Sequence, residues 1–313
     1  MNLNYHFCKF LWQQPWFRPR HGRWCYKTIC RHGEAPDYPF STDFFGLEYQ
    51  GNLQNSIDSS VYYYGAFEKP LLFFMQDCLQ AIHQAPSVFC DIGANIGQHS
   101  LFMSRVADQV HAFEPFDQVR LKLLRQIELN AIKNLSVHNV GLSDTLQSLP
   151  FYAPTGRNQG IGSFDASTTE KGNRNIGNLS LVTGDSYFRE HAISDIDLIK
   201  IDVEGFEKAV LAGLRETLNV DRPVVVCELT YGKDLSIRSM DEMVTLFPAD
   251  YQFFTFDIRK ADGSKARRKE AKARRTGDYQ LVPYHFARQR GQDDIIACPK
   301  ENLHRLPKRS AST

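Results

Sequence analysis

The segment VFCDIGANIGQHS at residues 88–100 constrains the fold of this chain more than any other feature. A short apolar run ends at Asp91, and Gly93, Asn95 and Gly97 then make a turn into a periodic stretch. Glycine tolerates positive φ and lets a ligand approach the backbone closely. A helix that starts after such a turn presents free N–H groups and a positive dipole end. The segment therefore predicts a strand, a tight turn and a helix that together hold a ligand.

The segments that follow alternate between buried-type strands and amphipathic helices. Strands are expected at 87–92, 109–114, 135–140, 197–203, 223–229, 251–256 and 294–298, and helices at 67–82, from about 98, at 117–132 and at 207–218. Strands that alternate with helices form a parallel sheet, and right-handed crossovers place helices on both of its faces. The predicted fold class is therefore α/β, with a doubly wound, mostly parallel sheet.

Three parts of the chain are expected. Residues 1–64 form an N-terminal extension with short strands, residues 65–300 form the α/β domain, and residues 301–313 form a tail. Two polar stretches, at about 142–186 and 257–292, interrupt the strand–helix rhythm and are expected to be insertions. Insertions of that length beside a sheet usually have a function.

The composition excludes several classes of protein. The net charge of +1 gives no global attraction to nucleic acid or to anionic membranes. The seven cysteines are scattered without a CxxC pair, so we expect no metal site and no disulfide framework. The first residues lack the pattern of a signal peptide, and the most apolar stretch, at 71–75, is too short to span a bilayer. We therefore expect a cytoplasmic protein.

Residues 1–33 differ from the rest because they contain no acidic side chain. A poorly ordered extension is one interpretation. The other is an arm that contacts the acceptor or a membrane surface without being integral to the membrane.

Glu114 follows the glycine turn by about twenty residues, the spacing at which a carboxylate accepts hydrogen bonds from ribose hydroxyls. The turn itself departs from the dinucleotide pattern G-x-G-x-x-G, because Asn95 replaces the second glycine and Gln98 stands at the third. It resembles the tighter loop of class I methyltransferases, whose ligand has no phosphate.

A second motif, DLIKIDVEGFEKAVLAGL, occupies residues 197–214. It places Lys200, Asp202 and Glu204 at alternate positions of a strand end, which predicts that their side chains share one face.

Taken together, the motifs resemble the FkbM family of methyltransferases. The matching segments are DIGANIG at 91–97, FEP at 113–115, NVGLSD at 139–144, IKIDVEGFE at 199–207, the Gly65-x-x-Glu68 step and DDIIACPK at 293–300. The resemblance covers residues from about 40 to 300. It implies a Rossmann-like, seven-stranded sheet with an antiparallel last strand, S-adenosylmethionine as the methyl donor, and O-methylation of sugars, glycolipids or polyketides. Asp202-Val-Glu-Gly stands where base N-methyltransferases usually carry Asn/Asp-Pro-Pro-aromatic, which argues against base methylation.

The expected site lies at the carboxyl ends of the strands, where open α/β sheets bind ligands. We expect the methionine part of the cofactor to be surrounded by Asp91, Gly93, Asn95 and Gly97, and the ribose to be held by Glu114. We expect Ser143 and Asp144 to lie near the adenine, and Asp202 and Glu204 near the methyl group. A carboxylate can take the proton of an alcohol. Asp202 is the first candidate base and Glu204 the second, although both could instead cap the following helix; His99 and His111 are weaker candidates.

The acceptor is expected to be a small molecule or a glycan. Residues 259–275 hold nine Lys or Arg against Asp262 and Glu270, so an anionic acceptor is one hypothesis and a solvated loop the other. Two further functions stay open: a cofactor-binding scaffold without catalysis, and an RNA methyltransferase that uses the basic segment. The near-neutral charge and the lack of an RNA-binding module count against nucleic acid as a partner.

Overall fold

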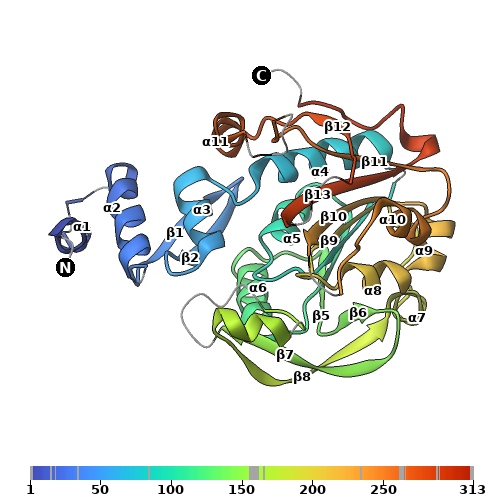
Figure 1. The fold of residues 1–313 in the computed structure, drawn as a ribbon, viewed down its shortest axis with the longest axis horizontal. Coiled ribbons are helices and arrows are strands. Elements are labelled where there is room, and N and C mark those ends of the chain that lie inside the picture. The colour runs from blue at the N-terminus through green and yellow to red at the C-terminus, as the bar shows by residue number, and fades with distance from the viewer. Residues whose placement is uncertain are drawn as a thin grey trace.

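The computed structural model describes residues 3–310 except 15, 18, 34, 84, 155–161, 165, 233–234, 261–263, 265, 287 and 289. Its centre is an eight-stranded sheet of order β12-β11-β13-β10-β9-β3-β4-β5 (Figure 1). The strands are β3 (Val88–Ile92), β4 (Gln109–Phe113), β5 (Leu135–His138), β9 (Leu198–Ile201), β10 (Val224–Tyr231), β11 (Tyr251–Phe256), β12 (Leu281–Pro283) and β13 (Gly291–Pro299).

Strands β5, β4, β3, β9 and β10 run parallel, whereas β13 runs antiparallel to both β10 and β11. This arrangement confirms the predicted Rossmann-like α/β class and its antiparallel last strand. The expected number of seven strands is wrong: β12 pairs with the outer edge of β11, because part of the stretch 257–292 returns to the sheet as a strand.

Helices cover both faces of the sheet, as predicted. One face carries α4 (Lys69–Ile82), α5 (Gln98–Met103) and α6 (Asp117–Leu129), and the other carries α7 (Gly184–Glu190), α8 (Glu207–Ala212), α9 (Arg215–Val220) and α10 (Met240–Leu246). Strand alternation explains the two cores: Phe89 packs in the first, while Val88 and Cys90 pack in the second. The single helix expected at 207–218 is two, α8 and α9, separated by Gly213 and Leu214.

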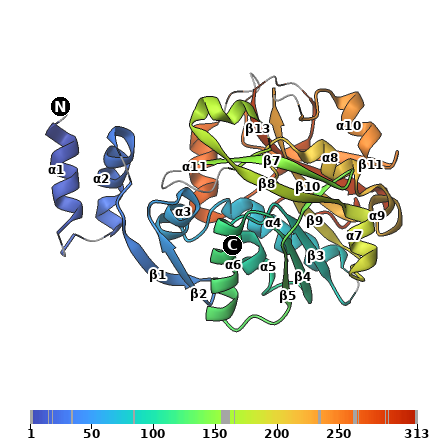
Figure 2. The same ribbon diagram turned by 90° about the horizontal axis from the view of Figure 1, so that it is seen from below.

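The insertion at 142–186 builds a structure of its own. It forms a three-stranded sheet of order β6-β8-β7, from β6 (Gly141–Ser143), β7 (Gln147–Pro154) and β8 (Asn173–Thr183), with the short helix η1 (Ala166–Lys171). Figure 2 shows β7 and β8 as long strands that cross the carboxyl-end side of the molecule. The parts 155–161 and 165 of this insertion lie outside the described residues.

The N-terminal extension contains the expected short strands, and within residues 1–33 it forms two helices instead of the poorly ordered segment that one interpretation expected. It contains α1 (Leu3–Trp12), α2 (Pro19–His32), the hairpin β1 (Pro39–Phe44) and β2 (Leu47–Asn52), and α3 (Ser56–Tyr64). Asn55 caps α3 by accepting hydrogen bonds from the N–H groups of Ile57 and Asp58. In the basic segment, α11 (Arg267–Thr276) packs on α4, and η2 (Lys300–Asn302) follows the last strand.

None of the helices in the described ranges combines the length and the apolar character that crossing a bilayer requires.

Helix α6 offers a matched pair of leucines that tests this packing. Leu123 is fully buried, whereas Leu121 on the same helix is 48% exposed. Leu123→Ala should lower the free energy of unfolding by about 2–5 kcal/mol, because it leaves a cavity in the core. Leu121→Ala should change it by less than about 0.5 kcal/mol. Chemical denaturation of both variants measures the difference, and equal losses would contradict the placement of α6.

Candidate active site

A cavity of about 100 Å³ lies at the carboxyl ends of β3, β4 and β9. Five of the nine predicted site residues line it: Gly93, Asn95, Glu114, Asp202 and Glu204. Apolar side chains supply most of the remaining wall, among them Phe116, Val119, Leu142, Phe151, Phe164 and Leu181. The cavity therefore joins a polar end on the sheet to an apolar end on the three-stranded insertion.

The apolar end is closed by aromatic contacts. The Phe164 ring lies 5.0 Å from the Phe151 ring and 5.3 Å from the Phe206 ring, measured between centroids. Small-molecule sites usually enclose about 300–1,000 Å³, so this cavity is smaller than most of them.

The glycine turn has the conformation that its sequence predicts. Gly93, Asn95 and Gly97 all have positive φ, at 84°, 55° and 81°. A Cβ atom at Gly93 would lie 1.9 Å from the carbonyl oxygen of Asp202, and one at Gly97 would lie 2.1 Å from Cδ1 of Leu123. These glycines are thus required for packing inside the protein, and Gly97 does not line the cavity.

Glu114 closes the turn from the end of β4. One of its carboxylate oxygens accepts a hydrogen bond from the N–H of Asn95 at 2.9 Å, and the other accepts one from Phe116 at 2.8 Å. Burial raises the pKa of Glu114 to about 7, although these two hydrogen bonds oppose the shift. The carboxylate is therefore fixed in place and changes its charge near neutral pH.

Asp91 lies beneath the cavity and does not line it. It is fully buried and accepts a hydrogen bond from Ser100 Oγ at 2.6 Å. Lys200 Nζ lies 3.5 Å from Asp91 Oδ1 and 3.3 Å from Asp202 Oδ2. Burial opposes the charge of Lys200, but Asp202 and Asp91 together raise its pKa above the ordinary value. Lys200 therefore stays charged and connects Asp91 to the cavity wall.

The structure does not bring Ser143 and Asp144 to the cavity. Ser143 is fully buried, and its hydroxyl accepts a hydrogen bond from Gln147 at 3.1 Å. Asp144 is exposed. From this segment Gly141 and Leu142 face the cavity instead.

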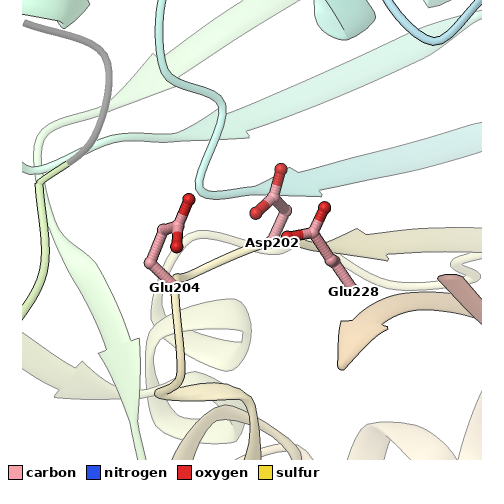
Figure 3. Close-up of side chains that lie close together, drawn as sticks. All are labelled: Asp202, Glu204 and Glu228. Carbon is pink, nitrogen blue, oxygen red and sulfur yellow. The ribbon is translucent and has the colours of Figure 1, made fainter. Parts of the chain in front are cut away.

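A third carboxylate, that of Glu228, lies beside those of Asp202 and Glu204 and was not predicted from the sequence. Figure 3 shows Asp202 between Glu204 and Glu228, which comes from β10. One carboxylate oxygen from each lies within 4.8 Å of the others, a spacing that can share a proton or hold a divalent cation. Burial raises the pKa of Glu228 well above its ordinary range, and Asp202 is the strongest of the neighbouring charges that add to this shift.

The loop after β9 places Glu204 by a turn and not by strand alternation. Glu204 and Gly205 both have positive φ, at 52° and 100°. The carboxylate of Glu207, at the start of α8, accepts a hydrogen bond from the N–H of Gly205 at 2.7 Å. This buried contact fixes the turn that carries Glu204.

A second cavity, of about 320 Å³, opens on the other side of Glu228. Its apolar wall includes Phe67, Leu71, Phe256 and Ile258. Five acidic residues, Glu68, Glu228, Glu270, Asp293 and Asp294, face it against one arginine, Arg274. Its volume falls in the range of small-molecule sites. Glu228 lines this cavity while Asp202 and Glu204 line the first, so the carboxylate cluster has members on the walls of both cavities.

The two histidines are poor candidates for a base. His99 is buried, and its Nε2 lies 3.4 Å from Glu68 Oε2. Burial lowers the pKa of His99 to about 3, so the ring stays neutral. His111 contacts His138 at 3.1 Å and lines neither cavity.

Comparisons with known proteins identify a family for this chain. A model of the methyltransferase FkbM domain matches residues 91–254. Methyltransferase 1 of Beauveria bassiana is 30% identical over 145 residues, which cover 41% of this chain and 58% of that protein. The chain thus spans little more than half the length of this curated relative.

Two solved structures are similar at low identity. The methyltransferase FkbM of Methylobacillus flagellatus KT is 16% identical, with a TM-score of 0.39, over 67% of this chain and 43% of that chain. A SAM-dependent methyltransferase of Agrobacterium tumefaciens is 12% identical, with a TM-score of 0.44, over 85% of this chain and 72% of that chain.

Glu114 gives a prediction about pH. If its carboxylate accepts hydrogen bonds from the ribose, the affinity for S-adenosylhomocysteine should fall as the pH drops through about 7, because protonation removes the charge. A ligand that binds only the ionised form loses about tenfold in affinity one unit below that pKa. Calorimetry from pH 8 to about 6 measures this change.

Glu114→Gln is the matched control. It should bind at least tenfold more weakly at pH 8 and lose the pH dependence, since a lost hydrogen bond to a charged group costs about 1.5–3 kcal/mol. An unchanged affinity in Glu114→Gln would rule out a ribose contact for Glu114.

Proposed function

The chain belongs to the FkbM methyltransferase family, and from this premise we propose that it methylates a hydroxyl group of a sugar, a glycolipid or a related metabolite. S-adenosylmethionine is its cofactor and supplies a methyl group bound to a positively charged sulfur. The single observation that carries the proposal is the closeness of Asp202 and Glu204, which line the first cavity, to Glu228, which lines the second: one carboxylate oxygen of each lies within 4.8 Å of the others.

The residues of the first cavity suit this cofactor chemically. Glu114 can accept hydrogen bonds from two ribose hydroxyls through its remaining lone pairs, and the loop at Gly93 and Asn95 offers backbone to the amino-acid end. Leu142 and Phe116 give the apolar wall that an adenine ring needs. The carboxylates of Asp202 and Glu204 favour a ligand with positive charge.

The acceptor enters the second cavity in this proposal. Glu228 lines that cavity, whereas Asp202 and Glu204 line the first. An acceptor hydroxyl held beside Glu228 therefore lies next to the wall of the cofactor cavity. Positioning of two reactants in this way can lower a barrier by about 7–11 kcal/mol.

The carboxylate cluster can also take the proton of the acceptor. Asp202 is held by the Lys200 ammonium at 3.3 Å, which competes for its lone pairs. Glu228, with its raised pKa, binds a proton more readily. We infer that Asp202 takes the acceptor's proton directly as the predicted base, and that Glu228 lies close enough to Asp202 to share a proton with it.

Kinetics of matched variants tests this role. Asp202→Asn and Glu228→Gln keep the shape of each side chain and remove its charge, so kcat should fall by about 10²–10⁴-fold while cofactor affinity changes little. Glu204→Gln is the control in the same cluster and should lose less. Transfer of labelled methyl groups to acceptor pools measures turnover, and calorimetry measures the affinity.

Three other outcomes would contradict the proposed roles of these carboxylates. Equal losses of affinity and turnover in Asp202→Asn would make Asp202 a cofactor contact. Cofactor binding without transfer to any pool would favour a scaffold. Loss of activity in EDTA, restored by Mg²⁺, would show that the three carboxylates hold a cation.

The charge around the second cavity favours a neutral acceptor over an anionic one. Acidic side chains dominate its wall, and much of the basic charge of segment 259–275 is paired: Lys269 with Asp257, Lys272 with Asp278, and Arg274 with Glu270. Arg259 pairs with Asp293. Residues 261–263 and 265 of this segment lie outside the described residues.

Salt dependence separates the two acceptor classes. Arg267, Arg268 and Arg275 are exposed on α11, so their replacement by Gln should leave the KM for the acceptor and its salt profile unchanged between about 50 and 500 mM. If the triple variant instead flattens a KM that rises with salt in the wild type, the segment attracts an anionic acceptor.

A further inference from the structure

Helices α1 and α2 form a pair that projects from the rest of the molecule (Figures 1 and 2). Their shared core is small and consists of the buried side chains of Cys8, Cys25 and Ile29. Helix α2 also contacts α3, through Tyr26 with Tyr63 and Arg23 with Tyr64, and other side chains of both helices are exposed.

The outward side of α1 is apolar. Leu3, Phe7 and Phe10 are 86%, 55% and 58% exposed. Their spacing of four and three residues places them in one stripe along the helix. Single exposed apolar residues are common on proteins, but a stripe of large ones marks an interaction surface.

The outward side of α2 combines an aromatic ring with positive charge. Trp24 is 56% exposed, and Lys27 and Arg31, three and seven residues later, are exposed on the same side of the helix. Trp16, between the helices, is 66% exposed. Tryptophan is enriched at the boundary between lipid and water, where lysine and arginine interact with anionic headgroups.

Residues 1–33 contain no aspartate or glutamate that would oppose such a contact. The whole chain has a net charge of only +1, so positive charge is concentrated in this pair of helices. Apolar stripes with flanking basic residues are typical of helices that lie in a membrane surface. The charge thus matches an anionic lipid headgroup layer better than it matches an apolar partner protein.

The pair is also fixed beside the second cavity. The Arg23 guanidinium lies 4.5 Å from the centroid of the Tyr64 ring, and Arg274 of α11 lies 5.5 Å from the same centroid. Arg274 lines the second cavity. A surface that binds α1 and α2 therefore lies close to the rim of the second cavity.

We propose that helices α1 and α2 bind the surface of an anionic lipid bilayer through Leu3, Phe7, Phe10 and Trp24, together with Lys27 and Arg31. This contact is independent of the identity of the methyl acceptor. It needs no helix that crosses the bilayer, because the apolar side chains enter only the headgroup boundary.

Sedimentation of the full chain with lipid vesicles tests the proposal. Vesicles of phosphatidylcholine with about one third phosphatidylglycerol should bind the protein at least tenfold more strongly than phosphatidylcholine alone, and salt should weaken this binding. Lys27→Glu with Arg31→Glu should reduce binding at least tenfold. Leu3→Ser, Phe7→Ser and Phe10→Ser in one chain should reduce it as much.

The control variant carries Leu146→Ser and Val220→Ser, which replace exposed apolar residues elsewhere (81% and 72% exposed) and should leave vesicle binding unchanged. Circular dichroism and cofactor affinity show that each variant is folded. No binding of the wild type to anionic vesicles, or equal binding of all variants, would overturn the proposal. A change of oligomeric state in the triple serine variant without vesicle binding by the wild type would also overturn it, in favour of self-association.

Discussion

The buried ion pair of Lys200 with Asp91 and Asp202 holds the centre of this structure together. Asp91 and Lys200 are register partners on adjacent strands β3 and β9, so the pair connects the two strands whose ends form the site. Breaking a buried pair by removing one partner costs about 3–5 kcal/mol, because the other charge is left without compensation. Beside this ion pair, the backbone at Gly93 approaches the carbonyl of Asp202 so closely that no Cβ fits between them.

This ion pair also sets the charge beside the carboxylate cluster of Asp202, Glu204 and Glu228. One lysine faces the two carboxylates of Asp91 and Asp202, while burial raises the pKa values of Glu228 and Asp294 and favours their neutral forms. A negative site attracts a cationic methyl donor, but the positive charge disappears as the methyl group leaves. Attraction that is lost in the transition state does not speed the reaction. The carboxylates can therefore raise the rate by accepting the acceptor's proton.

The elements that could be predicted from the sequence are those whose patterns lie within a few neighbouring residues. The strand, turn and helix around Gly93 were predictable, because glycine spacing and apolar periodicity act within a few residues. The polar composition after Ser143 predicts an insertion but not its structure. The insertion forms a sheet whose strands are exposed on one side and carry little apolar pattern. Helices α1 and α2 were missed for a similar reason: their apolar residues point partly to solvent.

At the site, the position of Glu228 could not be predicted from short-range sequence patterns either. The only local sign is a charged residue between Cys227 and Leu229 in a mostly apolar strand, where a carboxylate is costly unless it is paired or protonated. Its proximity to Asp202 depends on the pairing of β10 with β9, which no local pattern encodes.

The charge of a segment in the sequence can also differ from the charge around that segment in the folded protein. The nine basic residues of segment 259–275 suggest a strong positive field when read in sequence. In the fold, Lys269 and Lys272 face Asp257 and Asp278, which lie outside the segment, and the cavity beside α11 is acidic. The positive charge of α1 and α2 has no such acidic neighbours within residues 1–33. The N-terminal pair of helices, and not the more basic α11, is therefore the better surface for anionic lipid.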